Sequence, residues 1–154
     1  LLIETHNLAE SVLQWLLKQF SVDVRRLPDR SQDNKWTKEI AVQTLQALPI
    51  AKLDDELVRR LASQNLREIR NALIRGNSSL KALMFAALLS TIEHSDHPFL
   101  KLSADELRLT RLLDMADARN KKAGHSGSER IDREEAMEHA DFVIEWVQIF
   151  KGWY

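Results

Sequence analysis

The chain has no cysteine, few glycines and prolines, and no apolar run long enough to cross a membrane. Among 154 residues there are 4 Gly and 3 Pro. The lack of cysteine excludes disulfides and thiolate metal sites, which fits a reducing cytoplasm. The apolar stretch ALMFAALLS is far shorter than the roughly 20 residues that a spanning helix needs. We therefore expect a cytoplasmic protein with no membrane partner.

A large excess of charge of one sign is also missing. The formal net charge is −1, so the molecule as a whole does not attract nucleic acid. Any binding of phosphate has to come from a local cluster of cationic side chains.

Helix-forming residues dominate what is present. Hydrophobic residues make up 44% and charged residues 29% of the chain, the balance of an ordinary globular protein. The length suits one hydrophobic core. These features predict a single all-α domain over residues 1–154, folded as a bundle of about six helices. The chain opens LLIETHNL, without Met or a basic signal-peptide start, and we expect it to be part of a longer protein.

Apolar periodicity, capping residues and breakers place these helices along the chain. We expect them at residues 4–20, 36–48, 54–75, 79–93 and 103–119, with a last helix that begins near 132. The fourth is apolar nearly all round, which predicts a central position in the bundle.

The last helix has two apolar stripes. One contains Ala136, Ala140, Val143, Val147 and Phe150. The other contains Phe142, Trp146 and Ile149, roughly 120° away at 100° per residue. One stripe faces the core, and the second is covered either by another helix of the chain or by a second subunit. In the second case Phe142, Trp146 and Ile149 form a homodimer interface.

The corner between the last two long helices has the sequence RNKKAGH, from Arg119 to His125. The planar guanidinium group suits phosphate because it donates two parallel charge-assisted hydrogen bonds and keeps its charge. Histidine suits proton transfer because its reference pKa lies near neutrality. Three interpretations of the corner remain open from these residues: a solvated turn, a phosphate contact without catalysis, and a catalytic site.

The same stretch resembles the R-x(4–6)-H motif of HEPN domains, the higher eukaryote and prokaryote nucleotide-binding superfamily. Asn120 follows the arginine, as is common in that family, and five residues separate Arg119 from His125. In HEPN domains the motif also lies between the last two long helices of an all-α bundle. The resemblance is closest over the last 50 or so residues.

The resemblance implies a metal-independent endoribonuclease without a cofactor. Arg119 would neutralise the scissile phosphate, His125 would transfer protons, and Asn120 would order the motif or contact the substrate. The 2′-hydroxyl of RNA would attack, leaving a 2′,3′-cyclic phosphate and a 5′-hydroxyl. The family builds its site from two motifs that meet across a homodimer. Nearby cations expected to contact RNA are Lys121, Lys122 and Arg130.

Two other clusters have simpler explanations. The segment EHSDH contains Glu93, His94, Asp96 and His97, but its spacing matches no closed metal site, and a solvated loop explains it. A second cluster lies on the third helix, where four arginines share one face: Arg59, Arg60, Arg67 and Arg70. This face either follows an RNA backbone or is solvated and forms local ion pairs.

The leading hypothesis is therefore a HEPN-type ribonuclease. It would act as the effector part of a defence, toxin or RNA-processing protein, with further domains or an inhibitor protein as possible partners. The alternative is a catalytically inert HEPN-like module that dimerises or binds nucleic acid or a partner protein.

Overall fold

The computed structural model describes residues 1–51, 53–120 and 133–153, and these residues contain helices and loops but no strand. The all-α fold class is thus confirmed. None of the described helices combines the length and the hydropathy required to cross a bilayer. The α-helices in the described ranges are α1 (Leu2–Gln19), α2 (Lys38–Gln46), α3 (Asp55–Leu61), α4 (Leu66–Arg75), α5 (Leu80–Leu89), α6 (Pro98–Lys101), α7 (Ala104–Leu107), α8 (Leu109–Ala118) and α9 (Arg133–Ile149). Short 3-10 helices are η1 (Val24–Arg26), η2 (Arg30–Lys35) and η4 (Lys151–Trp153).

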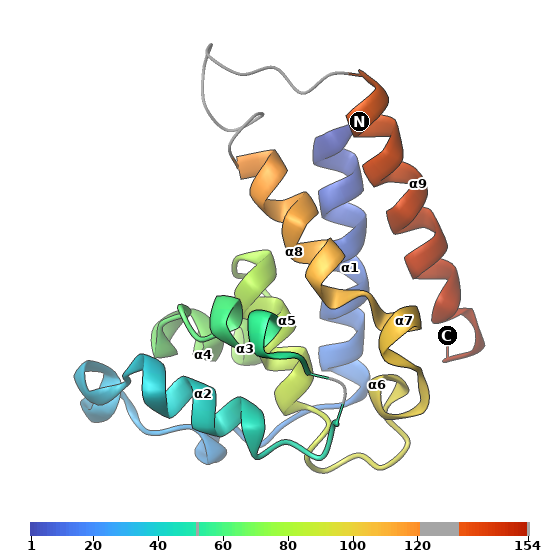
Figure 1. Cartoon of the computed structure of the whole chain (residues 1–154). Coiled ribbons are helices and arrows are strands. Elements are labelled where there is room, and N and C mark those ends of the chain that lie inside the picture. Colours follow the sequence, from blue (N-terminus) through green and yellow to red (C-terminus); the bar gives the residue numbers. More distant parts are fainter. Residues whose placement is uncertain (52, 121–132, 154) are drawn as a thin grey trace.

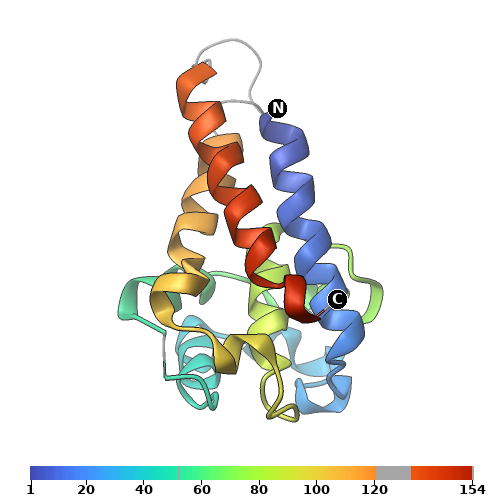
Figure 2. The ribbon, with the colours of Figure 1, turned by 90° about the vertical axis from the view of Figure 1, so that its right-hand side faces the viewer.

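Three long helices, α1, α8 and α9, run side by side (Figure 1). Helix α1 lies between α8 and α9 in Figure 1, and in the view of Figure 2 α9 is in front of both. The first residues of α1, the last of α8 and the first of α9 all lie at the same end of the bundle. Helices α2, α3 and α4 gather at the other end of the molecule, where α3 and α4 pack against α5 (Figure 1).

Helix α5 occupies the centre, as its sequence predicts. Every residue from Ala82 to Leu89 is buried, and the helix packs against α1, α3, α4 and α8. A helix that is apolar on all sides is stable only where neighbours cover every face. These four helices supply that cover.

Capping residues set most helix ends. The side chains of Asp54 and Ser79 accept hydrogen bonds from backbone N–H groups in the first turns of α3 and α5. Ser103 and Glu106 form the predicted capping box at the start of α7. Gly76 ends α4 with φ +63°, in the left-handed region that glycine enters without strain.

The single helix expected over residues 54–75 is two helices, α3 and α4. The chain leaves the helix after Leu61, and Asn65 then caps α4 by accepting a hydrogen bond from the Glu68 N–H. The predicted arginine face is therefore wrong. Arg60 turns toward α8, whereas Arg70 is 7% exposed and binds Asp33 and the Pro28 carbonyl.

The helix expected over residues 103–119 is likewise divided, into α7 and α8. Arg108 separates them with φ +41° and ψ +45°, an unusual conformation for a side chain with a Cβ atom. Its guanidinium group lies 5.1 Å from the centre of the Phe142 ring and contacts Glu145 at 3.3 Å. These contacts to α9 help to hold a strained residue in place. With α6 added, the described chain has more helices than the six expected.

The stripe assigned to a homodimer interface lies within one chain. Phe142 is 6% exposed and Trp146 is fully buried. The Trp146 indole N–H donates to the Leu107 carbonyl at 2.8 Å, and Ile149 is partly buried against the same core. Helices α7 and α8 cover this stripe, so the intramolecular alternative holds and the interface assignment is corrected.

We predict that Trp146→Phe lowers the free energy of unfolding by roughly 1–3 kcal/mol, because the Leu107 carbonyl loses a buried hydrogen bond. Urea unfolding at several protein concentrations measures this loss, which should not depend on concentration. Trp153→Phe changes a partly buried ring near the C-terminal end and should lower the free energy of unfolding by less. A loss that shrinks at high protein concentration would instead place Trp146 at a subunit contact.

Candidate functional site

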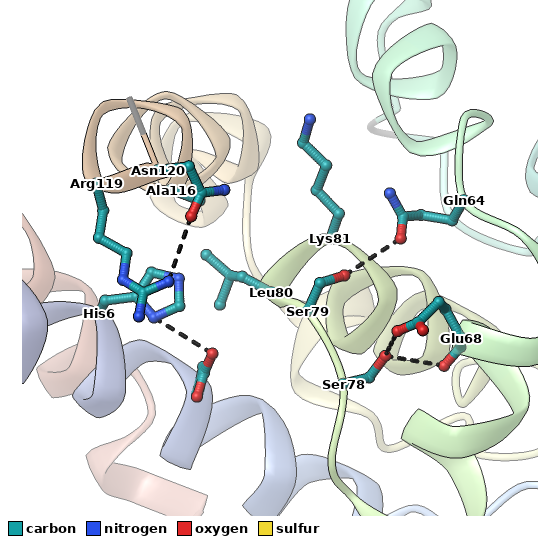
Figure 3. A pocket seen from close by; sticks show the side chains of 11 residues that line it. His6, Gln64, Glu68, Ser78, Ser79, Leu80, Lys81, Ala116, Arg119 and Asn120 are labelled. Atoms are coloured by element: carbon teal, nitrogen blue, oxygen red, sulfur yellow. Dashed lines mark hydrogen bonds and ion pairs between the residues drawn. The ribbon is translucent and has the colours of Figure 1, made fainter. Parts of the chain in front are cut away.

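A polar pocket of about 570 Å³ lies between α1, the start of α5 and the end of α8. We call it the α1–α8 pocket. Its size falls in the range typical of ligand sites. Figure 3 shows its side chains, all of them labelled except Glu10. It is lined by His6, Glu10, Gln64, Glu68, Ser78, Ser79, Leu80, Lys81, Ala116, Arg119 and Asn120.

Arg119 follows the last residue of α8, and its half-buried side chain lines the pocket. One guanidinium N–H donates to Oδ1 of Asn120 at 3.3 Å (Figure 3). Within the described residues, this guanidinium group forms no ion pair with a carboxylate. The structure thus brings two residues of the predicted motif together at the pocket, and most donors of Arg119 are free for a ligand.

By contrast, the other two arginines that are partly or fully buried among the described residues, Arg60 and Arg70, are bound to carboxylates. Arg60 binds Asp114 at 2.8 Å and Asp117 at 2.7 Å, joining α3 to α8. Arg70 is held by Asp33 and by a backbone carbonyl. Charges that leave water normally need such partners. Arg119 therefore differs from these structural arginines because its guanidinium group can still bind an anion.

A histidine from the first helix faces the same pocket. His6 is 4% exposed, and its Nδ1 lies 3.2 Å from Oε1 of Glu10 without hydrogen-bond geometry. Burial, aided by the charge of Arg119, lowers the pKa of His6 to about 4. Burial also raises the pKa of Glu10, although Arg119 opposes that change. At neutral pH the ring is thus an uncharged imidazole beside a cation.

The first turn of α5 forms another wall of the pocket. Ser79 caps the helix, and Lys81 contacts Asp117 at 3.3 Å. Burial disfavours ionisation of Asp117, yet hydrogen bonds from Arg60 and Lys81 and their charges hold its pKa below the usual range. Asp117 thus links the end of α8 both to α3 and to the start of α5.

Several residues predicted for the site cannot be placed. His125, Lys121, Lys122 and Arg130 lie outside the described residues. Their roles remain predictions from the sequence.

The histidines of the EHSDH segment already have protein partners. The Nδ1 atom of His97 accepts from the Phe99 N–H at 3.0 Å, and its Nε2 lies 2.7 Å from the Ser90 hydroxyl. His94 contacts the Ser21 carbonyl at 2.8 Å, while Glu93 pairs with Arg26. Among the described residues, no group of three or more acidic or histidine side chains is placed to hold a metal ion. The segment is a structural loop.

His6 and Glu10 are site residues that the sequence analysis missed. A signal was present, because His6 lies in register with Ala9, Leu13 and Leu16 on the buried face of α1. A histidine at a core position, with a carboxylate one turn later, marks a site where a titratable group is desolvated.

Comparisons with known proteins leave the family open: no protein-family model, curated protein or solved structure gives a significant match to this chain.

We predict that acid weakens the fold partly through His6. The pKa is about 4 in the folded chain against a reference value of 6.5. Between these values the unfolded chain binds more protons, so the free energy of unfolding falls as pH decreases through this window. The loss is at most roughly 3.5 kcal/mol at about 1.4 kcal/mol per pKa unit.

Chemical unfolding of wild type and His6→Gln at pH 4 to 8 tests this linkage. The His6→Gln protein should show a shallower dependence between pH 6.5 and 4. Part of the slope should remain, because burial also lowers the pKa of His97 to about 4. An unchanged slope would mean that His6 is not buried as the neutral ring.

Proposed function

We propose that this chain is a metal-independent endoribonuclease of the HEPN type, in which Arg119 binds the scissile phosphate. One observation carries the proposal: a half-buried arginine without a carboxylate partner in the described residues faces a polar pocket at the end of α8. A guanidinium group in this setting favours a phosphodiester, whose two unesterified oxygens match its parallel donors.

Asn120 contributes by orienting the arginine. Its side-chain oxygen accepts a hydrogen bond from the Arg119 guanidinium group. That bond engages one N–H and leaves the others for phosphate oxygens. This contact supports the ordering role that the motif predicts for Asn120.

The reaction follows from the resemblance of the motif. The 2′-oxygen of RNA attacks phosphorus, the bond to the 5′-oxygen breaks, and a 2′,3′-cyclic phosphate and a 5′-hydroxyl form. One proton leaves the 2′-hydroxyl, and one is delivered to the 5′-oxygen. The proposal assigns His125 to this proton transfer, which contributes roughly 10²- to 10⁴-fold when the group is well placed.

A homodimer remains part of the proposal, but its contact surface has to differ from the one predicted. Phe142 and Trp146 are core residues, whereas Met137 and Ile144 of α9 are 47% and 50% exposed. These exposed apolar side chains are the ones that α9 offers to a second copy. We place such a dimer in the cytoplasm, as the effector of a larger defence, toxin or RNA-processing protein.

The proposal predicts cleavage of mixed RNA in EDTA with 2′,3′-cyclic phosphate ends. Arg119→Ala should lower the cleavage rate by about 10²- to 10³-fold, the usual effect of removing one donor that stabilises transition-state charge. His125→Ala should also lose activity. Gel analysis of labelled RNA and mass spectrometry of its ends measure both effects.

Arg75→Ala is the matched control, because Arg75 is an exposed arginine at the far end of α4 that does not line the α1–α8 pocket. It should cleave like wild type. Equal cleavage by all four proteins would reveal a contaminating nuclease and contradict the proposal. A folded wild-type chain without activity would favour the inert HEPN-like module.

A further inference from the structure

Two buried histidines among the described residues, His6 and His139, have ring nitrogens without a hydrogen bond, and of these two only His6 lines the α1–α8 pocket. It is 4% exposed, and its Nδ1 has no hydrogen-bond partner. Buried polar atoms are nearly always bonded, whereas the His6 Nδ1 lies 3.2 Å from Oε1 of Glu10 without hydrogen-bond geometry. The ring belongs to the wall of the α1–α8 pocket and lies beside the Arg119 guanidinium group (Figure 3).

Donors from two other elements converge on this pocket. Helix α5 begins there, and the N–H groups in the first turn of a helix lack partners within the helix and attract anions. Lys81 adds an ammonium group, which Asp117 partly neutralises. Arg119 completes the set from α8. A buried ring, a helix start and a free guanidinium group together favour an anionic ligand.

The charges around His6 explain why it is neutral without a ligand. Glu10 on α1 is the nearest carboxylate, and Glu68 of α4 lies on the pocket wall but accepts a hydrogen bond from Ser78. Cations reach the pocket from α5 and α8, while α9 contributes no described side chain to its lining. Burial and Arg119 therefore disfavour the imidazolium form. A bound phosphate counters both effects, because its negative charge offsets Arg119 and one of its oxygens accepts a hydrogen bond from the protonated ring.

We propose that the α1–α8 pocket binds a phosphodiester of a nucleic-acid strand with uptake of one proton by His6, so that His6 and Arg119 hold the same phosphate. The choice of a nucleic acid as the ligand rests on the proposed function, but the test of binding requires no RNA cleavage. The proton comes from solvent on binding and returns to solvent on release. The pocket volume of about 570 Å³ leaves space beside the phosphate for the sugar and base.

Titration of the histidine rings by NMR tests this proposal in the wild-type chain. The His6 signal is identified by its absence in His6→Gln. The pKa of His6 is measured in the protein without ligand, with inorganic phosphate, and with a short oligodeoxynucleotide. The oligodeoxynucleotide presents phosphodiesters but no 2′-hydroxyl. We expect the oligodeoxynucleotide to raise the pKa of His6 by at least about one unit. By linkage, the protonated form then binds at least about tenfold more tightly than the neutral form.

Calorimetry in two buffers with different ionisation enthalpies counts the protons taken up. With a one-unit rise in the His6 pKa, wild type should take up roughly half a proton between pH 4 and 5, and more if the rise is larger, with affinity that rises as pH falls. His6→Gln should bind about tenfold more weakly and take up none, which is the expected loss of one charge-assisted hydrogen bond. His94→Gln is the control at the other end of α5 and should behave like wild type.

The outcomes separate this inference from the proposed ribonuclease. An oligodeoxynucleotide-dependent shift without RNA cleavage would support the binding site and contradict the nuclease. Cleavage with an unshifted His6 would overturn the binding site alone. A shift with inorganic phosphate only would overturn the assignment to a nucleic-acid strand.

Discussion

Burial of α5 on all sides is the constraint on which the structure depends. Its residues from Ala82 to Leu89 are at most 4% exposed, so each neighbouring helix has to cover one of its faces. Short side chains at Ala82, Ala86 and Ala87 let neighbouring helices approach closely. Because α1 and α8 both pack against this helix, its first turn becomes the floor of the α1–α8 pocket. The site is thus built on a helix that is packed on all sides.

The arginines show how the structure separates stabilising charges from available ones. Arg60 and Arg70 are enclosed and bonded to carboxylates, and they tie α3 to α8 and α4 to η2. Arg119 lies at the end of α8, beyond Asp114 and Asp117, which are engaged with Arg60. Near the end of α8, Asp114 and Asp117 are therefore bound to Arg60, whereas Arg119 faces a pocket. This separation gives the phosphate-binding proposal its physical basis.

Helix breaks show where local sequence patterns mislead. The apolar periodicity across residues 54–75 continues through the turn at Asn65, so periodicity alone predicts one helix. Asn65 is both a tolerable residue within a helix and a good cap, and only packing decided between these roles. At Arg108 no local signal indicates a positive φ. The contacts of its side chain with α9, distant in sequence, hold that conformation.

By itself the sequence determined the all-α class, the central position of α5 and most of the caps, because these follow from periodicity and from hydrogen bonds between near neighbours. It also placed Arg119 and Asn120 at the end of a long helix. Tertiary structure alone decided that Phe142 and Trp146 belong to the core and that His6 lies beside Arg119. The burial of Phe142 and Trp146 and the meeting of His6 with Arg119 depend on which helix faces pack together. Local sequence does not specify this packing, because His6 and Arg119 are more than a hundred positions apart.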